Sequence, residues 1–191
     1  MARAASQIET EIKLQVVSVA DAGRLLRSKG WRVARRRLFE SNTLLDTGHL
    51  ALRRKNNLLR LRQAGERHLL TFKGSPLAGA YKSRAEFESE FDDPEAMRAI
   101  LAGLGYAPVF RYEKFRTEYA KAGQPGIIVA DETPIGDFLE LEGPPRWIDR
   151  TARELGYSPS DYITASYSYL YMAHCRSKGL TPRHMVFSSR K

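Results

Sequence analysis

Cysteine and histidine are scarce in this sequence, and the few that occur do not form a recognisable site. Cys175 is the only cysteine among 191 residues. A single thiol excludes an intramolecular disulfide framework and a cysteine-rich zinc site. The four histidines, His49, His68, His174 and His184, are scattered without the spacing of metal ligands, so we assign them surface or packing roles.

Long apolar segments are also missing. No run of about 18 apolar residues could span a bilayer, and the opening MARAASQIETEIK lacks the apolar region of a signal peptide. The sequence contains no P-loop, no dinucleotide-binding glycine motif, no HExxH and no GxSxG. We therefore expect a soluble, cytoplasmic protein with no membrane partner.

Positive charge is what the sequence has in excess. The formal net charge is +9, and 42% of the residues are hydrophobic, which is enough apolar material for one sizeable core. The charge favours anionic partners such as nucleotides, phosphates or nucleic acid without choosing among them. We predict a single domain over residues 1–175, followed by a basic C-terminal tail, 176–191, that behaves as a solvated end.

The order of the elements predicts long antiparallel strands interrupted by helices. Alternation and turn signals predict eight strands, at 8–14, 31–41, 57–63, 67–73, 81–91, 107–121, 126–132 and 137–142. Short connections such as AGE at 64–66 imply antiparallel neighbours. Caps and stop signals predict helices at 19–29, at 94–104, in the segment RWIDRTAREL before Gly156, and at 160–175.

Most of the predicted strands carry charge on one face only. In LLRLR, Arg60 and Arg62 alternate with leucines. In SRAEFESEF, Arg84, Glu86 and Glu88 share one parity against alanine and phenylalanine. Successive residues of a strand point to opposite sides of the sheet. Each of these strands therefore has one charged face and one apolar face.

Two arrangements are compatible with this pattern. The charged face could lie in water while the apolar face packs on helices, as is common for antiparallel sheets. The polar face of these strands is, however, almost entirely Glu, Arg and Lys. Like charges at positions i and i+2 repel each other unless an oppositely charged partner offsets the repulsion. Eight antiparallel strands are also about the number that closes around one small ligand. We therefore predict an α+β fold with a closed or nearly closed eight-stranded antiparallel β-barrel, a charged lumen, and helices packed outside.

The predicted lumen brings together two opposed sets of charges. Its acids would be Glu9, Glu11, Asp131, Glu140 and Glu142. Its bases would be Lys13, Arg60, Arg62, Lys73, Arg84, Lys114 and Arg116. A polyanion that carries a divalent metal suits this lining, because bases neutralise phosphate oxygens and carboxylates hold a hard cation. A triphosphate with Mg²⁺ or Mn²⁺ fits both sets.

These residues carry a resemblance to a known family. Glu9-Thr10-Glu11-Ile12-Lys13 resembles the N-terminal ExExK signature of the CYTH superfamily, also called triphosphate tunnel metalloenzymes. The segments LLRLR, LLTFKG, SRAEFESEF, RYEKFRTEY and VADETPIGDFLELEG follow in family order, so the resemblance covers residues 8 to about 170. The superfamily includes class IV adenylyl cyclases, thiamine triphosphatases and inorganic triphosphatases.

The resemblance implies roles for the lumenal residues. The metal ligands would be Glu9, Glu11, Glu140, Glu142 and Asp131. The triphosphate would be bound by Lys13, Arg60, Arg62, Lys73 and Arg116, with Arg84 and Lys114 as additions. Glu86 and Glu88 lie in an R-x-E-x-E-like strand, where they either join the site or pair with neighbouring arginines. Some triphosphatases carry a lysine in the C-terminal helix, where this sequence has Ser166 and Tyr167, which weakens a thiamine triphosphatase assignment.

The reaction stays open between two outcomes. Attack of a ribose 3′-hydroxyl on ATP would give cyclic AMP and pyrophosphate, whereas attack of water on the terminal phosphorus would hydrolyse inorganic, nucleoside or thiamine triphosphate. The resemblance is nearest to bacterial proteins labelled class IV adenylyl cyclase, so we rank cyclisation first. A non-catalytic module that binds polyphosphate or RNA is the third possibility, although we do not expect nucleic acid as a partner. A homodimer is compatible with the resemblance, and no catalytic residue is assigned.

Overall fold

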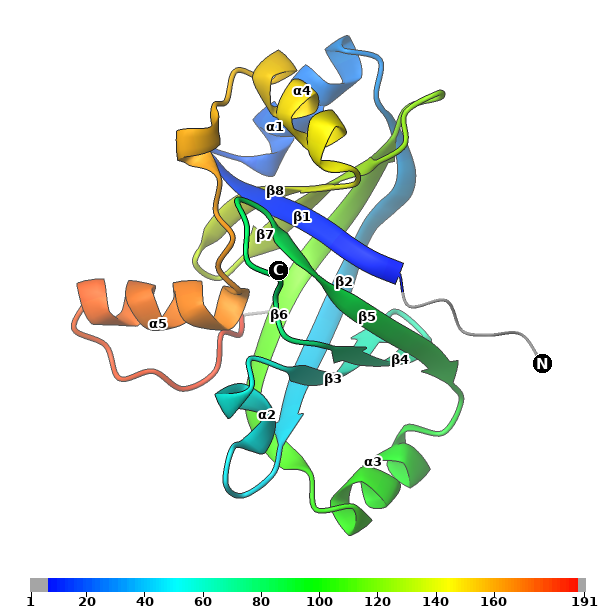
Figure 1. Ribbon diagram of the computed structural model, residues 1–191, viewed down its shortest axis with the longest axis vertical. Helices are drawn as coiled ribbons and strands as arrows, with labels where there is room; N and C mark the ends of the chain where they lie inside the picture. The colour runs from blue at the N-terminus through cyan, green and yellow to red at the C-terminus, as the bar shows by residue number, and fades with distance from the viewer. Residues whose placement is uncertain (1–6, 189–191) are drawn as a thin grey trace.

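A closed barrel of eight strands lies at the centre of the computed structural model, which describes residues 7–188 (Figure 1). The strands are β1 (Gln7–Val16), β2 (Arg32–Asp46), β3 (Leu58–Ala64), β4 (Arg67–Lys73), β5 (Lys82–Phe91), β6 (Ala107–Ala120), β7 (Ile127–Thr133) and β8 (Gly136–Glu142). Around the barrel they follow the order β1-β5-β4-β3-β2-β6-β7-β8, and β8 pairs with β1 to close it. The predicted antiparallel barrel is confirmed.

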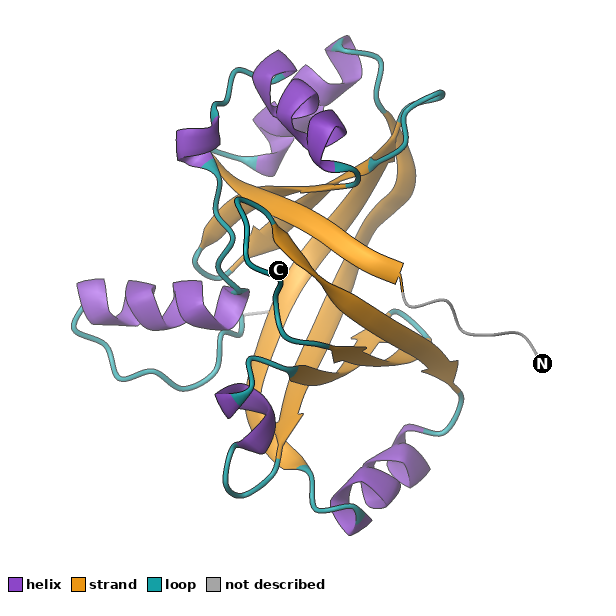
Figure 2. Ribbon diagram, in the orientation of Figure 1, coloured by secondary structure: helices purple, strands orange, loops and turns teal. Residues whose placement is uncertain are grey.

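The helices lie outside the barrel (Figure 2). They are α1 (Val19–Ser28), α2 (Ala51–Arg54), α3 (Pro94–Gly103), α4 (Pro145–Glu154) and α5 (Tyr167–Ser177). The predicted caps are present: Ser18 accepts a hydrogen bond from the backbone of α1, and Asp93 accepts two from the backbone of α3. The one-turn helix α2 was not predicted. Among the described residues, no helix has both the length and the apolar character that crossing a membrane requires.

The helix predicted at 160–175 begins later than expected. Residues Pro159–Asp161 form a single 3₁₀ turn, which is stabilised by Ser158. Ile163 then pairs with Lys13 of β1 through two backbone hydrogen bonds of 2.8 and 2.9 Å. Because these bonds require extended backbone, the helix can start only afterwards, and Ser166 caps it. Ser158 and Pro159 therefore mark a single turn rather than the start of α5.

The apolar parity of the strands faces outward and is covered by helices. Ile12 of β1 and Leu141 of β8 are fully buried beneath α1 and α4, together with Leu26 and Ile148 from those helices. In Figure 1 the two helices lie together at the top, against β1 and β8. This arrangement leaves the charged parity of the same strands to face the lumen.

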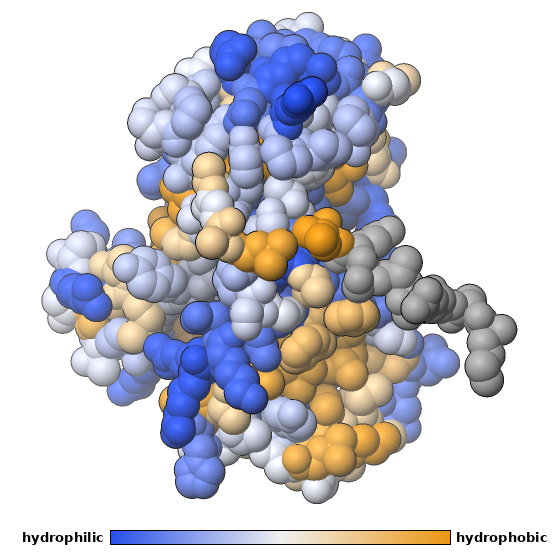
Figure 3. Space-filling model, viewed as in Figure 1, coloured by the Kyte–Doolittle hydropathy of each residue, from blue (hydrophilic) through white to orange (hydrophobic). Residues whose placement is uncertain are grey.

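A second apolar cluster lies on the other side of the barrel. Leu101 of α3 packs with Leu45 and Leu59 from β2 and β3. The cover is incomplete here, because Ile100 and Leu104 remain exposed. Figure 3 shows apolar residues gathered low in the view, around α3 and the adjacent strands, whereas the surface over α1 and α4 is polar.

The segment after the last strand is bound to the barrel at two points. We call residues 162–187, which include α5, the C-terminal strap. Ile163 pairs with β1 at its beginning, and the fully buried Met185 pairs with Tyr112 of β6 near its end. Part of the predicted solvated tail, 176–191, is therefore packed rather than solvated. Residues 189–191 lie outside the described part of the chain.

We expect Gly126→Ala to destabilise the fold. A Cβ added at Gly126 would lie 2.5 Å from the ring of Trp147 in α4 and 2.6 Å from the carbonyl oxygen of Glu142. Overpacking of this kind costs about 1–3 kcal/mol. Gly103→Ala is the control, because its Cβ meets nothing within 4 Å and alanine favours the helical state. In urea denaturation, the midpoint concentration should be lower for Gly126→Ala than for the wild type and unchanged or higher for Gly103→Ala. Equal midpoints for Gly126→Ala and the wild type would contradict this packing.

Candidate functional site

The barrel encloses a cavity of about 890 Å³. Residues of β1–β6 and β8 line it, together with the start of α5. Every predicted lumenal residue lines this cavity except Asp131, which is fully buried on β7. The lining members of that set are Glu9, Glu11, Lys13, Arg60, Arg62, Lys73, Arg84, Lys114, Arg116, Glu140 and Glu142.

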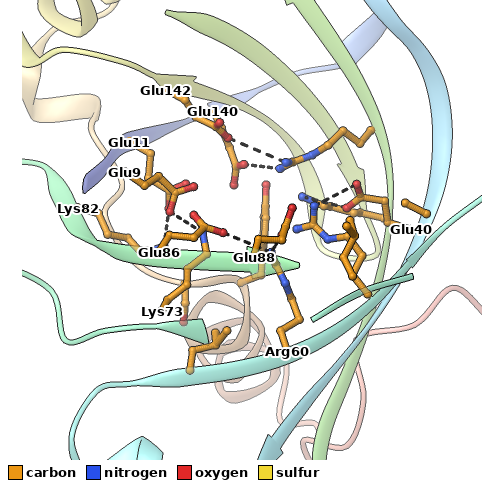
Figure 4. Close-up of a pocket in the computed structure, with 18 of the residues that line it drawn as sticks. Glu9, Glu11, Glu40, Arg60, Lys73, Lys82, Glu86, Glu88, Glu140 and Glu142 are labelled. Carbon is orange, nitrogen blue, oxygen red and sulfur yellow. Dashed lines mark hydrogen bonds and ion pairs between the residues drawn. The ribbon is translucent and has the colours of Figure 1, made fainter. Parts of the chain in front are cut away.

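Three carboxylates converge where β1 meets β8. Oxygen atoms of Glu9, Glu11 and Glu142 lie within 4.8 Å of one another, because the strand register pairs Glu11 directly with Glu142. Figure 4 shows Glu9 and Glu11 beside Glu142 in the lumen, with Arg60 reaching in from the other side. Burial and then the neighbouring carboxylates raise the pKa of Glu142 to about 8, against the attraction of Arg116. Convergent carboxylate oxygens are the donor set that hard divalent cations take, so this cluster could hold one.

The two other predicted acids are engaged by bases. Glu140 lies 3.1 Å from the Nζ of Lys13 and also contacts Arg116. Asp131 accepts hydrogen bonds from Lys114 at 2.8 Å and from Arg116 at 2.7 and 2.8 Å. The five predicted acids therefore divide into a cluster of three and two that lie outside it.

Lysines surround the three-carboxylate cluster. The Nζ of Lys13 lies 3.0 Å from Glu11, which Lys82 also contacts, and Lys73 pairs with Glu9. Burial and the neighbouring charge of Lys13 lower the pKa of Lys82 to about 8. In this structure the lysines balance the carboxylates, so a cation that binds here has to compete with them.

Arg84 is a buried basic residue of the lumen whose charge is not balanced by a neighbour among the described residues. Its side chain lines the cavity although only 5% of the residue is exposed. Within residues 7–188 it has no hydrogen bond or ion pair, and its Nε atom is buried without a partner. A guanidinium keeps its charge at any physiological pH, and an unpaired buried charge is costly. The side chain is therefore placed to receive an anion.

Several lining residues were not predicted as site residues. Lys82 shares the parity of Arg84, and Glu40 lies 3.4 Å from Arg62 and 3.6 Å from Lys114. Lys82 lies two residues before Arg84 on the same face of the strand, so continuing the alternation back into the segment YKSR would have identified it. Glu40 lies within the predicted strand 31–41, but the pairing of β2 with β6 shifts register between Val33 and Leu38, so simple alternation along that strand does not reveal its lumenal position.

Comparisons with known proteins agree with this geometry. The family model described as the CYTH domain matches residues 7–167. A protein of Methanocaldococcus jannaschii, named "putative adenylate cyclase", is 29% identical over 135 residues, which is 71% of this chain and 76% of the relative.

Two solved structures show how closely the fold is shared. A "putative adenylate cyclase" of Vibrio parahaemolyticus has a TM-score of 0.75 at 20% identity, over 86% of this chain and 98% of its own. A Hippeastrum protein, described as a "putative adenylyl cyclase" with a dominant triphosphatase activity, has a TM-score of 0.63 at 20% identity, over 92% and 97%. The family model spans most of the length of this chain, and the barrel carries the charged lumen that the sequence signature predicts. The chain therefore belongs to the CYTH domain family.

Proposed function

We propose that this protein is a divalent-metal-dependent enzyme that hydrolyses triphosphates inside its barrel. The observation that carries the proposal is the buried, unpaired Arg84 in a cavity that also holds three convergent carboxylates. An anion alone would satisfy only the arginine, and a cation alone only the carboxylates. A triphosphate with its metal satisfies both, and CYTH family members are generally triphosphate-processing enzymes.

The carboxylates of Glu9, Glu11 and Glu142 would hold the metal, Mg²⁺ or Mn²⁺. A divalent cation bound there supplies Lewis-acid stabilisation of charge on a phosphoryl oxygen. Lys73 and Lys82 pair with two of these carboxylates in this structure. Once the metal replaces them, Lys82 can turn toward phosphate oxygens, whereas Lys73 keeps its ion pair with Glu86 at 2.9 Å. This exchange of partners keeps the buried charges balanced when substrate and metal enter together.

The bases would fix the phosphate chain. Arg60, Arg84, Lys114 and Arg116 come from three different strands and line one cavity. Phosphoryl transfer asks the protein mainly for positioning and for stabilisation of charge on the transferred group. Cations held by a closed barrel supply both, because their positions are set by the strands and not by mobile loops.

Hydrolysis is ranked above cyclisation because it needs nothing beyond water and the charged lining. Cyclisation of ATP is the second candidate, and two observations favour it. The Methanocaldococcus jannaschii relative is named "putative adenylate cyclase". In addition, the cavity lining includes the apolar side chains of Leu38 and Leu69, which could pack against the adenine ring of ATP.

A panel of triphosphates with product identification tests the proposal. With Mn²⁺ or Mg²⁺, we expect orthophosphate from tripolyphosphate and from ATP. The double variant Glu9→Gln, Glu11→Gln should lower the rate by about 100-fold or more, because it removes preorganised charge. Glu95→Gln, an exposed acid on α3, is the control and should behave as the wild type.

The same assay separates the alternatives. Cyclic AMP and pyrophosphate from ATP would identify a cyclase. No product from any triphosphate, together with undiminished polyanion binding by the double variant, would identify a non-catalytic binding module and reject the proposal.

We expect Arg84→Met to stabilise the free protein while it abolishes the response to ligand. Replacing a buried unpaired charge by an apolar side chain should raise the free energy of unfolding by about 1 kcal/mol or more. The rise in melting temperature that tripolyphosphate and Mg²⁺ cause in the wild type should disappear. Arg98→Met, at an exposed arginine of α3, should keep that rise. An unchanged ligand response in Arg84→Met would remove the main support for the phosphate site.

A further inference from the structure

Tyr167, the first residue of α5, lies in the wall of the lumen. It is 6% exposed, and its hydroxyl donates a 2.9 Å hydrogen bond to Oδ2 of Asp131. Its ring centroid is 5.2 Å from the Nζ of Lys13 and 5.4 Å from the Nζ of Lys114. In the structure it contacts charged groups from three strands, β1, β6 and β7.

Asp131 does not line the cavity, and both of its carboxylate oxygens accept hydrogen bonds. Its Oδ2 accepts hydrogen bonds from Lys114, from Arg116 and from Tyr167, and its Oδ1 accepts one from the Nε of Arg116. The residue is 0% exposed, and it does not belong to the three-carboxylate cluster. A carboxylate enclosed by four donor contacts is suited to holding cations in place and poorly suited to coordinating a metal.

We propose that Asp131 and Tyr167 are a pair of positioning residues that hold Lys114 and Arg116 in place along the lumen, and that Asp131 is not a metal ligand. The carboxylate fixes the two cations, and the tyrosine hydroxyl fixes the carboxylate. The tyrosine ring adds an attractive face for the lysine ammonium. This assignment replaces the metal-ligand role that the sequence suggested for Asp131. The inference rests on the proposed function only in one respect: the anion that Lys114 and Arg116 would bind in the lumen is taken to be a triphosphate.

The C-terminal strap holds Tyr167 in position. On one side Ile163 is hydrogen bonded to β1, and on the other Met185 is hydrogen bonded to β6. Ser166 caps the helix directly before the tyrosine. The family match ends at residue 167, so the anchor at Met185 lies beyond the matched region. A residue held from both sides in this way can position its partners without moving itself.

The first test is spectroscopic and does not depend on turnover. In the wild type, the ammonium ¹H–¹⁵N signal of Lys114 should be protected from exchange by its hydrogen bond to Asp131. Tyr167→Phe and Asp131→Asn should broaden or abolish that signal. Tyr169→Phe, at an exposed tyrosine of the same helix, is the matched control and should leave it unchanged. A Lys114 signal that survives both lumenal substitutions would overturn the positioning role.

The second test separates a positioning residue from a metal ligand. Titration with Mn²⁺ alone should give an affinity for Asp131→Asn within about twofold of the wild type, whereas Glu11→Gln should weaken it at least about tenfold, the loss expected when a charged contact is removed. Equal losses in the two variants would make Asp131 a ligand. Should Asp131→Asn fail to fold, Tyr167→Phe, which keeps the ring, carries the spectroscopic test alone.

Kinetics add a signature that a structural role would not produce. Asp131→Asn removes a carboxylate that competes with phosphate for two cations, so KM for tripolyphosphate should stay level or fall while kcat drops about tenfold or more. Tyr167→Phe should lower kcat by about three- to tenfold at constant KM. An unchanged kcat in both variants contradicts the inference. A wild type without triphosphate turnover rejects the proposed function instead, and the lysine signal and Mn²⁺ titration still decide the inference.

Discussion

Balance of buried charge is the constraint on which this structure depends. Closing the barrel turns the charged face of its strands toward one cavity, where many of the charged side chains are buried. Lys13, at 2% exposure, can keep its charge there because carboxylate oxygens of Glu11 and Glu140 lie 3.0 and 3.1 Å from its Nζ. Removing one member of such a set leaves an uncompensated buried charge, which destabilises a fold far more than the pair stabilises it. The lining is therefore constrained by folding as strongly as by chemistry.

Two places in this network of charges define the site. At Arg84 the positive charge has no partner among the described residues. At Glu9, Glu11 and Glu142 three carboxylates converge, and the lysines that balance them are the partners that a bound cation would replace. Natural proteins tolerate such local costs where a ligand removes them. A ligand that carries both signs of charge, with the cation and anion joined, relieves both places at once. Neither feature by itself would suggest a metal-bound polyanion, and the proposal of such a ligand rests on finding the two within one cavity.

The sequence predicted what depends on local periodicity and missed what depends on register. The alternation in LLRLR and SRAEFESEF is a period of two, so strand positions and the inward parity could be inferred directly. Which acid meets which base is decided by long-range pairing. Arg116 lies opposite Asp131 and Glu11 lies opposite Glu142, and no local pattern encodes those neighbours. The late start of α5 has the same origin, because a helix signal at 158–161 is overridden by pairing of Ile163 with a strand about 150 residues away in sequence.

The C-terminal strap both completes the hydrogen bonding of the barrel strands and places a residue in the site. β5 pairs with β1 only as far as Glu11, and β7 pairs with β6 only from Phe115 onward, so backbone groups of β1 and β6 beyond these points need other partners. Ile163 supplies them at Lys13, and Met185 supplies them at Arg111 and Glu113. The segment that joins these two anchors runs from β1 to β6, and the start of α5 within it lines the cavity. Tyr167 lies on that path, so the same hydrogen bonds that complete the sheet also bring a phenol to Asp131.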